Sequence, residues 1–266
     1  MATTAILSAL EQEQQGLRAQ LTGARQVQRA GREFWLGDLH GAPVVLALSR
    51  IGKVAAATTA TTLIEAFGAD RIVFTGVAGA LGPDVRVGDV VVASHFVQHD
   101  MDASPLFPRF EVPLYRQAQF ACDPGLTELL AQACRQTMAQ WQQQHTNPPQ
   151  VPPPAVHQGL IASGDRFIGT AQVSRDVQQG LRAHAMHALA VEMEGAAVAQ
   201  VCHDYGTAFA AVRTISDRAD DIAHVDFAQF VNDVAGVYAQ RILVNFIARL
   251  VADPGGPSAP GRPGAC

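Results

Sequence analysis

Residues 72–80 read Ile72-Val73-Phe74-Thr75-Gly76-Val77-Ala78-Gly79-Ala80, and this stretch indicates the fold class. A short, continuous apolar run is typical of a strand buried on both faces, so Ile72–Val77 is predicted to be such a strand. The two glycines would let a ligand approach the backbone closely, although they equally suit a tight strand-to-helix turn. No Gly-Lys-Ser/Thr follows, so the stretch is not a P-loop.

Similar apolar runs lie on both sides of this stretch and alternate with helical patterns. The predicted strands are Thr4–Leu7, Val44–Leu48, Val90–Ala93 and Phe209–Val212, and the predicted helices are Lys53–Phe67, Leu126–Gln140, Met193–His203 and Phe227–Leu250. Phe34–Leu39 and Val44–Leu48 flank Gly41, which predicts a β-hairpin. Strands interleaved with helices indicate an α/β sandwich.

Two segments interrupt this pattern. Gln142–Pro154 is rich in Gln and Pro and is expected to be a surface insertion, because proline interrupts helices and central strands. Residues 254–266 are rich in Gly, Pro and Ser, which predicts a disordered tail. Strand-like and helix-like patterns continue on both sides of the insertion. We therefore expect a single domain over residues 1–253, and 48% hydrophobic residues can supply its core.

The composition argues against several classes of function. The formal net charge is −5 and the 19 Lys and Arg are scattered, whereas nucleic-acid binding needs clustered cations. Glu11 and Glu13 follow the first apolar run with no basic residue before them, so no signal peptide is expected. No uncharged apolar run reaches about 18 residues, so we expect no membrane span and a cytoplasmic protein. The four cysteines lack metal-site spacing, and three of them are expected to be buried thiols.

Two predicted strands end in polar residues that could bind a ligand. Ser163-Gly164-Asp165-Arg166-Phe167-Ile168 follows an apolar run, and ligands of open α/β sheets gather at the carboxyl ends of strands. The segment could also be an ordinary loop with an Asp–Arg pair. Arg213-Thr214-Ile215-Ser216-Asp217 ends the last predicted strand. Asp217 could act as a general acid if kept protonated, be held ionised by Arg213, or cap a following turn.

The segment Val191-Glu192-Met193-Glu194-Gly195 places two carboxylates in an apolar region. Buried carboxylates are costly without partners, and a carboxylate can accept hydrogen bonds from the vicinal hydroxyls of a ribose. Capping of the next helix explains one of these glutamates more easily than two.

Two other polar features predict no ligand from the residues alone. Glu13 is typical of a solvated residue in a first helical turn. The group His95, His99, Asp100 and Asp102 has no metal-ligand spacing, and its members are expected to make polar loop contacts.

Taken in order, the motifs resemble those of the bacterial methylthioadenosine/S-adenosylhomocysteine nucleosidases. The matching stretches are Ala9–Glu13, Ile51–Ala56, Thr75–Gly79, Val87–Val92, Ser163–Ile168, Val191–Glu194 and Ile215–Asp217. The resemblance implies a three-layer αβα sandwich around a mixed sheet, a homodimer, and no metal or organic cofactor. It also implies a small-molecule nucleoside substrate whose N9–C1′ bond is hydrolysed to release adenine and a thio-sugar.

The resemblance assigns roles to residues of these motifs. Asp217 would protonate the leaving adenine at N7, and Glu13 would activate the attacking water while the ribose gains oxocarbenium character. Glu194 would hold the ribose hydroxyls. The other residues expected to bind substrate are Met193 beside the sugar, Phe167 and Ile168 at the base, Gly79 through its backbone, and Ile51 and Phe227.

Some positions depart from the family pattern. Members often have Ser at the position of Val77 and Gly at that of Ala80. Where the family builds its 5′-alkylthio pocket, this chain has the smaller or non-aromatic residues Ala103, Leu106 and Pro108. A wider pocket that favours S-adenosylhomocysteine is therefore a hypothesis.

Three alternatives stay open on the sequence. A phosphorolytic enzyme of the same fold would need cationic side chains to hold phosphate, and Arg50 keeps that possibility open. A sister hydrolase could act on another 6-substituted purine or on a menaquinone-pathway nucleoside. A non-catalytic sensor should have lost an acid or base group, whereas Glu13, Glu194 and Asp217 are all present.

Overall fold

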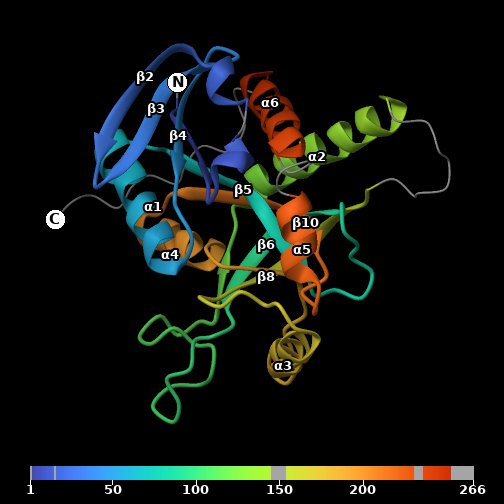
Figure 1. The fold of residues 1–266 in the computed structure, drawn as a ribbon. Helices are drawn as coiled ribbons and strands as arrows, with labels where there is room; N and C mark the ends of the chain where they lie inside the picture. The colour runs from blue at the N-terminus through green and yellow to red at the C-terminus, as the bar shows by residue number, and fades with distance from the viewer. Residues whose placement is uncertain (1, 15, 145–153, 231–235, 253–266) are drawn as a thin grey trace.

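The computed structural model describes residues 2–14, 16–144, 154–230 and 236–252. All described strands join one mixed sheet (Figure 1). They are β1 (Thr4–Ser8), β2 (Thr22–Arg29), β3 (Arg32–Leu39), β4 (Ala42–Leu48), β5 (Arg71–Ala80), β6 (Val90–Gln98), β7 (Gln119–Ala121), β8 (Val156–Ser163), β9 (Ala188–Glu192) and β10 (Ala208–Asp217). The pairing order is β10-β6-β8-β9-β5-β1-β4-β3-β2, with β7 beside β6.

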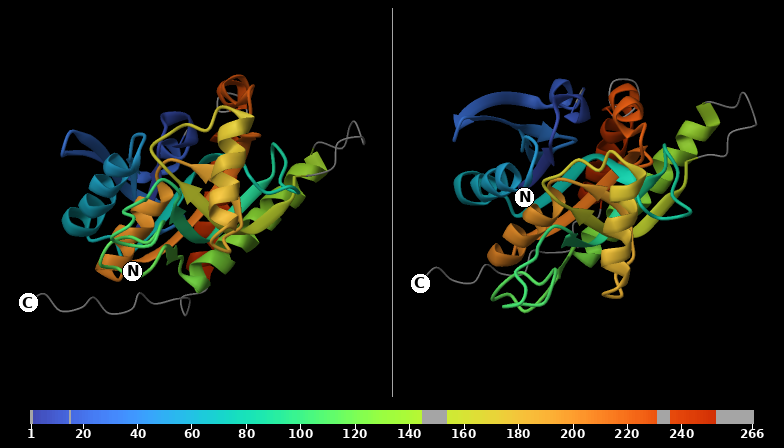
Figure 2. Two further views of the ribbon diagram at one scale, coloured as in Figure 1. Left: turned by 90° about the horizontal axis from the view of Figure 1, so that it is seen from below. Right: turned by 60° about the horizontal axis from the view of Figure 1, so that its bottom comes forward.

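Helices cover both faces of this sheet. They are η1 (Glu11–Gln14), η2 (Arg18–Gln20), α1 (Lys53–Phe67), α2 (Pro124–Gln144), α3 (Ala171–Arg182), α4 (Gly195–Tyr205), α5 (Ala223–Phe230) and α6 (Gly236–Ala252). One apolar core joins α1 and α4 to the sheet, and a second joins α2 and α6 to it. In all views α1 and α2 lie on opposite sides of the sheet (Figures 1 and 2). The expected sandwich around a mixed sheet is confirmed.

The sheet also closes on itself, which no local pattern predicts. β5 pairs with β10 in parallel and with β9 antiparallel. β6 pairs antiparallel with β10, and β6, β8 and β9 run parallel to one another. These pairings form a ring of five strands. β5 and β9 are antiparallel and pair near their carboxyl ends. The carboxyl end of β9 therefore lies beside the carboxyl ends of β5 and of its parallel neighbour β10.

Most predicted elements are present. β1, β4, β5, β6 and β10 contain the predicted strands, and β3 and β4 form the expected hairpin with Leu39 opposite Ala42. His40 and Gly41 connect them with φ angles of 51° and 82°, the positive values that a two-residue hairpin turn of type I′ requires. α1 ends as predicted, at Phe67, and Gly68 caps it in the left-handed conformation that favours glycine.

Some predicted boundaries differ from the structure. The described parts of Phe227–Leu250 lie in α5 and α6, and α5 begins earlier than predicted, at Ala223; residues 231–235 lie outside the described part of the chain. The helix expected from Met193 begins at Gly195. α2 continues into the expected insertion as far as Gln144, since the prolines lie further on. The remainder of the insertion up to residue 153 and the expected tail at 254–266 lie outside the described residues.

Cys122, Cys134 and Cys202 are buried free thiols, as expected. No helix within the described residues is long and apolar enough to cross a membrane.

Candidate active site

A cavity of about 350 Å³ opens where the carboxyl ends of β5, β9 and β10 meet the loop after β1. All nine residues that the sequence analysis selected line this one cavity: Glu13, Ile51, Gly79, Phe167, Ile168, Met193, Glu194, Asp217 and Phe227. Their positions in the sequence span more than 200 residues, so the ring of strands is what brings them together.

Glu13 is buried, which is opposite to what its place in a first helical turn suggests. Its side chain points from η1 into the protein, and the residue is only 2% exposed. Oε2 accepts hydrogen bonds from the amides of Ala9 at 2.8 Å and Leu10 at 2.9 Å, and Oε1 accepts one from Val77 at 3.1 Å. Burial raises the pKa of Glu13, and these amides oppose that effect in part. The carboxylate is therefore fixed in orientation and more basic than an ordinary glutamate.

Glu194 immediately precedes α4 and is also buried. Its Oε1 accepts a hydrogen bond from the amide of Gly52 at 2.8 Å. Burial, and then the negative charge of Glu192, raise the pKa of Glu194 above its usual range. Met193 beside it is half-buried. Glu194 thus presents carboxylate oxygen to the cavity, where two adjacent hydroxyls would find acceptors.

Glu192, two residues earlier, has a different environment. Its carboxylate forms an ion pair with Arg213 at 2.7 Å and accepts hydrogen bonds from the amides of Glu194 and Gly195. The hydroxyl of Ser163 also donates to it. Glu192 is therefore satisfied by protein groups, although it reaches the cavity wall. The sequence did not distinguish the two glutamates, because only the tertiary structure supplies these partners.

The position of Arg213 contradicts one alternative considered for Asp217, in which Arg213 holds the aspartate ionised. The guanidinium of Arg213 pairs with Glu192 and lies over the ring of Phe74 at 4.0 Å, so its ion pair is not with the aspartate. Arg213 is only 1% exposed, and a buried charge of this kind needs a close partner. Glu192 on β9 and Arg213 on β10 lie on either side of β5, so their ion pair can be seen only once the strand pairing is known.

Asp217 ends β10 and lies against the backbone of β5. Its Oδ2 accepts a hydrogen bond from the hydroxyl of Ser216 at 2.8 Å, and its Oδ1 accepts one from the amide of Ala219 at 2.8 Å. The pairing register shifts between Ile215 and Asp217, so the end of the strand is irregular where the carboxyl group enters the cavity. A Cβ on Gly79 would lie 2.8 Å from Oδ1 of Asp217, so the absence of a side chain there makes room for the aspartate.

The opposite wall carries aromatic and aliphatic groups. The Phe167 ring is 5.9 Å from the Phe227 ring at 75°, in an edge-to-face arrangement. Phe167 is 44% exposed and Ile51 is 56% exposed, whereas Ile168 is buried. Exposed rings and aliphatic groups beside a cavity offer a surface on which a flat heterocycle can stack.

A polar cluster that the sequence analysis treated as loop contacts supports this wall. The ammonium of Lys53 contacts Oδ1 of Asp100 at 2.6 Å, and the other oxygen of Asp100 accepts a hydrogen bond from the amide of Asp165. Asp165 in turn accepts one from the amide of Lys53 at 2.7 Å. The start of α1 and the loop carrying Phe167 are thereby tied together. Lys53 was missed because its partners lie about 47 and 112 residues away in sequence.

In the described part of the chain, no group of three or more His, Cys, Asp or Glu residues is arranged to hold a metal ion. The cavity combines instead three buried carboxyl groups from Glu13, Glu194 and Asp217 with an aromatic surface. Such an arrangement can donate a proton at one point, accept one at another, and hold hydroxyl groups between them.

Comparisons with known proteins show which family the chain resembles. A family model described as the phosphorylase superfamily matches residues 3–248. The 5′-methylthioadenosine/S-adenosylhomocysteine nucleosidase of Aeromonas salmonicida is 34% identical over 245 residues, which cover 92% of this chain and 98% of that protein.

Solved structures show the same similarity. The 5′-methylthioadenosine/S-adenosylhomocysteine nucleosidase of Neisseria meningitidis, in complex with methylthio-immucillin-A, superposes with a TM-score of 0.82 at 34% identity. That match covers 94% of this chain and all of that one. The futalosine hydrolase of Helicobacter pylori superposes with a TM-score of 0.80 at 30% identity, covering 94% of this chain and 98% of that one.

Proposed function

The chain belongs to the phosphorylase superfamily and, within it, to the 5′-methylthioadenosine/S-adenosylhomocysteine nucleosidases, and from this premise we propose that it hydrolyses the N9–C1′ bond of these two nucleosides. The products are adenine and the corresponding thio-ribose. The observation that carries the proposal is the convergence of Glu13, Glu194 and Asp217 on one cavity with an aromatic wall.

Asp217 is proposed to be the general acid. Adenine leaves poorly as an anion, so a proton must reach its ring nitrogen N7 as the glycosidic bond lengthens. The hydrogen bonds from Ser216 and Ala219 hold the Asp217 carboxyl group at the end of β10. A positioned acid of this kind contributes about 10²-fold to 10⁴-fold to a rate.

Glu13 is proposed to be the general base. Three backbone amides hold its carboxylate in one orientation; Oε2 accepts two of these hydrogen bonds, and Oε1, which accepts one, retains a lone pair for a water molecule. Its raised pKa makes it a better base than an exposed glutamate. Water activated in this way would attack C1′ as the sugar develops oxocarbenium character.

Glu194 is proposed to bind the ribose hydroxyls, with Met193 against the sugar. Phe167 and Ile168 would hold the base, and Gly79 would let it approach the backbone of β5. Ile51 and Phe227 would contact the 5′ substituent. All of these residues line the same cavity, which supports the assignment.

Hydrolysis is favoured over phosphorolysis by the placement of the cations. Arg50, which kept phosphorolysis open, lines a different cavity from Glu13 and Asp217. Arg213 is already paired with Glu192. Among the described residues that line the catalytic cavity, Arg166 supplies the one cationic side chain, and it is exposed. A phosphate ion that attacks C1′ would need more donors than this.

A related nucleoside is the second candidate substrate. The futalosine hydrolase of Helicobacter pylori has a similar fold at 30% identity, so futalosine stays a candidate substrate. Ala103, Leu106 and Pro108, which the family resemblance places at the 5′ pocket, are not among the described residues that line the catalytic cavity, so the wider pocket stays a hypothesis.

We also propose a cytoplasmic homodimer with one domain over residues 1–253, as the family resemblance implies. Leu106 and Leu114, in the segment between β6 and β7, are 83% and 85% exposed, and such apolar groups favour contact with a second copy. Light scattering coupled to size-exclusion chromatography tests the dimer, and a mass of one chain would contradict it.

The enzymatic test is adenine release from S-adenosylhomocysteine and from 5′-methylthioadenosine, with and without phosphate. We expect release from both without phosphate. A strict requirement for phosphate would assign the protein to the phosphorylases instead. Release from neither, but from futalosine, would assign it to the second candidate. Asp217→Asn, which should lose at least 100-fold in kcat while still binding substrate, is the control for adventitious activity.

A further inference from the structure

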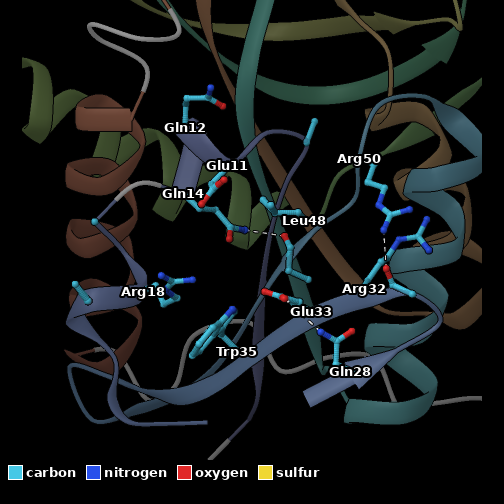
Figure 3. A pocket seen from close by; sticks show the side chains of 15 residues that line it. Glu11, Gln12, Gln14, Arg18, Gln28, Arg32, Glu33, Trp35, Leu48 and Arg50 are labelled. Carbon is cyan, nitrogen blue, oxygen red and sulfur yellow. Dashed lines mark hydrogen bonds between the residues drawn. The ribbon is translucent and has the colours of Figure 1, made fainter. Parts of the chain in front are cut away.

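A second cavity, of about 720 Å³, lies on the other side of η1 from the catalytic cavity. Glu13 faces the catalytic cavity, while Glu11, Gln12 and Gln14 of the same turn line the second one, and Ala9 borders both. Figure 3 shows Arg32 and Arg50 together on one side of this cavity, and Arg18 with Trp35 on the opposite side. None of these side chains takes part in the proposed reaction.

Arg32 and Arg50 are held side by side by the turn between β2 and β3. The guanidinium of Arg50 donates to the carbonyl of Gly31 at 2.6 Å, and that of Arg32 donates to the neighbouring carbonyl of Ala30 at 3.1 Å. Arg32 also donates to the carbonyl of Ala55 at 3.2 Å. Neutral carbonyl groups thus fix two positive charges close to each other.

This pair has no counter-ion from the protein. Within the described residues, neither Arg32 nor Arg50 has a carboxylate oxygen within 4 Å. The Nε–H of Arg32 is buried and has no hydrogen-bond acceptor, which is rare for a native guanidinium. Burial and then the charge of Arg50 lower the pKa of Arg32, as mutual repulsion requires.

The backbone supports the same interpretation. Arg50 has φ of 68°, in the left-handed region that a side-chain-bearing residue occupies at some cost. With this backbone conformation the exposed Arg50 side chain donates to the carbonyl of Gly31, next to the carbonyl that Arg32 contacts. Two adjacent guanidiniums with an unused N–H are the usual recognition element for a carboxylate or phosphate group.

We propose that Arg32 and Arg50 form an oxyanion site in the second cavity and that it binds a carboxylate or phosphate group. The carboxylates of Glu11 and Glu33, which also line the cavity, confine an anion to the arginine end and would attract an ammonium group. An α-amino acid group carries both charges and matches this pattern.

Such a group could come from two sources. One is a free small acid or phosphate. The other is the amino-acid tail of S-adenosylhomocysteine, since Arg50 directly precedes Ile51 of the catalytic cavity and Ala9 borders both cavities. This second source rests on the proposed function, whereas the oxyanion site itself does not.

The first experiment measures anion binding without any nucleoside. Isothermal titration of the full chain with inorganic phosphate and with acetate is compared for the wild type, Arg50→Asn and Arg32→Gln. Asparagine tolerates a positive φ, so Arg50→Asn should fold, and Arg50→Lys retains the charge without the planar donors. We expect binding to weaken about tenfold in Arg50→Asn and Arg32→Gln. Arg18→Gln, in the same cavity but stacked on Trp35, is the matched control and should bind anions as the wild type does.

The second experiment separates the two sources. The ratio of kcat/KM for S-adenosylhomocysteine to that for 5′-methylthioadenosine, which lacks the amino-acid tail, should fall about tenfold in Arg50→Asn if the tail is the ligand. An unchanged ratio with anion binding that depends on Arg50 assigns the site to a free anion. Anion binding that is absent, or equal in wild type and both variants, together with an unchanged ratio, overturns the proposal. If neither nucleoside is cleaved, the proposed function fails, and the titration alone still decides on the site.

Discussion

Replacing Gly79 with alanine should disable the proposed acid without changing any ionisable group. The added Cβ would lie 2.8 Å from Oδ1 of Asp217 and 3.0 Å from Cβ of Ala219. Ordinary contact begins at 3.4 Å, so the aspartate contact is short by roughly 0.6 Å. Gly79 pairs with β9 through Val191 and with β10 through Asp217 itself, so its backbone is held from both sides. The side chain of Asp217 must therefore move.

The expected effect follows from that displacement. A misplacement of about 1 Å at a reacting group costs about 100-fold in rate, so we expect kcat for adenine release to fall about 10-fold to 100-fold. Overpacking of a buried site should also lower the free energy of unfolding by about 1–3 kcal/mol. Steady-state kinetics at saturating nucleoside and urea denaturation measure the two effects separately.

Gly180→Ala is the matched control. Gly180 lies within α3, and an added Cβ there meets no atom closer than 3.6 Å, which is ordinary contact. Alanine in a helix should stabilise it slightly and leave kcat unchanged. If Gly79→Ala retained kcat within about twofold of wild type while folding normally, the role of Asp217 as a positioned acid, and the steric reasoning for Gly79, would both be refuted.

Three further predictions concern ionisable groups. Because burial raises the pKa of Glu13 and a base must be ionised, kcat/KM should fall on the acid side at a pH above the usual glutamate value of 4.5; a profile that stays flat down to pH 4.5 would contradict this. Glu194→Gln should lower kcat/KM about 10-fold to 100-fold, because an amide offers one acceptor oxygen in place of two; an effect on kcat alone, with KM unchanged, would argue against a hydroxyl-binding role. Burial would raise the pKa of Asp89, but hydrogen bonds from the amide of Ala155, from His157 and from the amide of Arg86 outweigh it and lower that pKa. Asp89→Asn should therefore lower the free energy of unfolding by about 1–3 kcal/mol at pH 7. Urea denaturation should show the difference between wild type and variant shrinking as pH falls through the lowered pKa of Asp89. An equal difference at pH 7 and pH 3 would contradict the stabilising role of the ionised Asp89.

The sequence predicted the local elements well because their causes are local. Apolar runs of strand length, the hairpin around Gly41 and the periodicity of α1 depend on residues within a few positions. Over Phe227–Leu250 the described residues are helical, in α5 and α6, as the apolar pattern predicts.

The candidate site shows a similar division. Motif resemblance selected nine residues that line one cavity, although residue-by-residue reasoning placed Glu13 on the surface. A glutamate in a first helical turn is usually solvated, whereas here the amides of Ala9 and Leu10, together with that of Val77 from β5, satisfy the buried carboxylate. Glu192 likewise has partners on other strands, Arg213 on β10 and Ser163 on β8. The local sequence pattern therefore does not distinguish Glu192 from Glu194, which accepts a hydrogen bond from Gly52 instead.

The sequence by itself therefore determined most of the longer strands and helices, though not β2, β7, β9 or α3, as well as the class of fold and the residue types available for acid, base and hydroxyl binding. The tertiary structure alone decided that the sheet closes into a ring, that Arg213 neutralises Glu192 rather than Asp217, and that Arg50 faces a second cavity. The physical reason is that burial and charge pairing depend on contacts between strands far apart in sequence. The sequence specifies which side chains are available, but the distance between two of them is fixed only when the strands that carry them have paired.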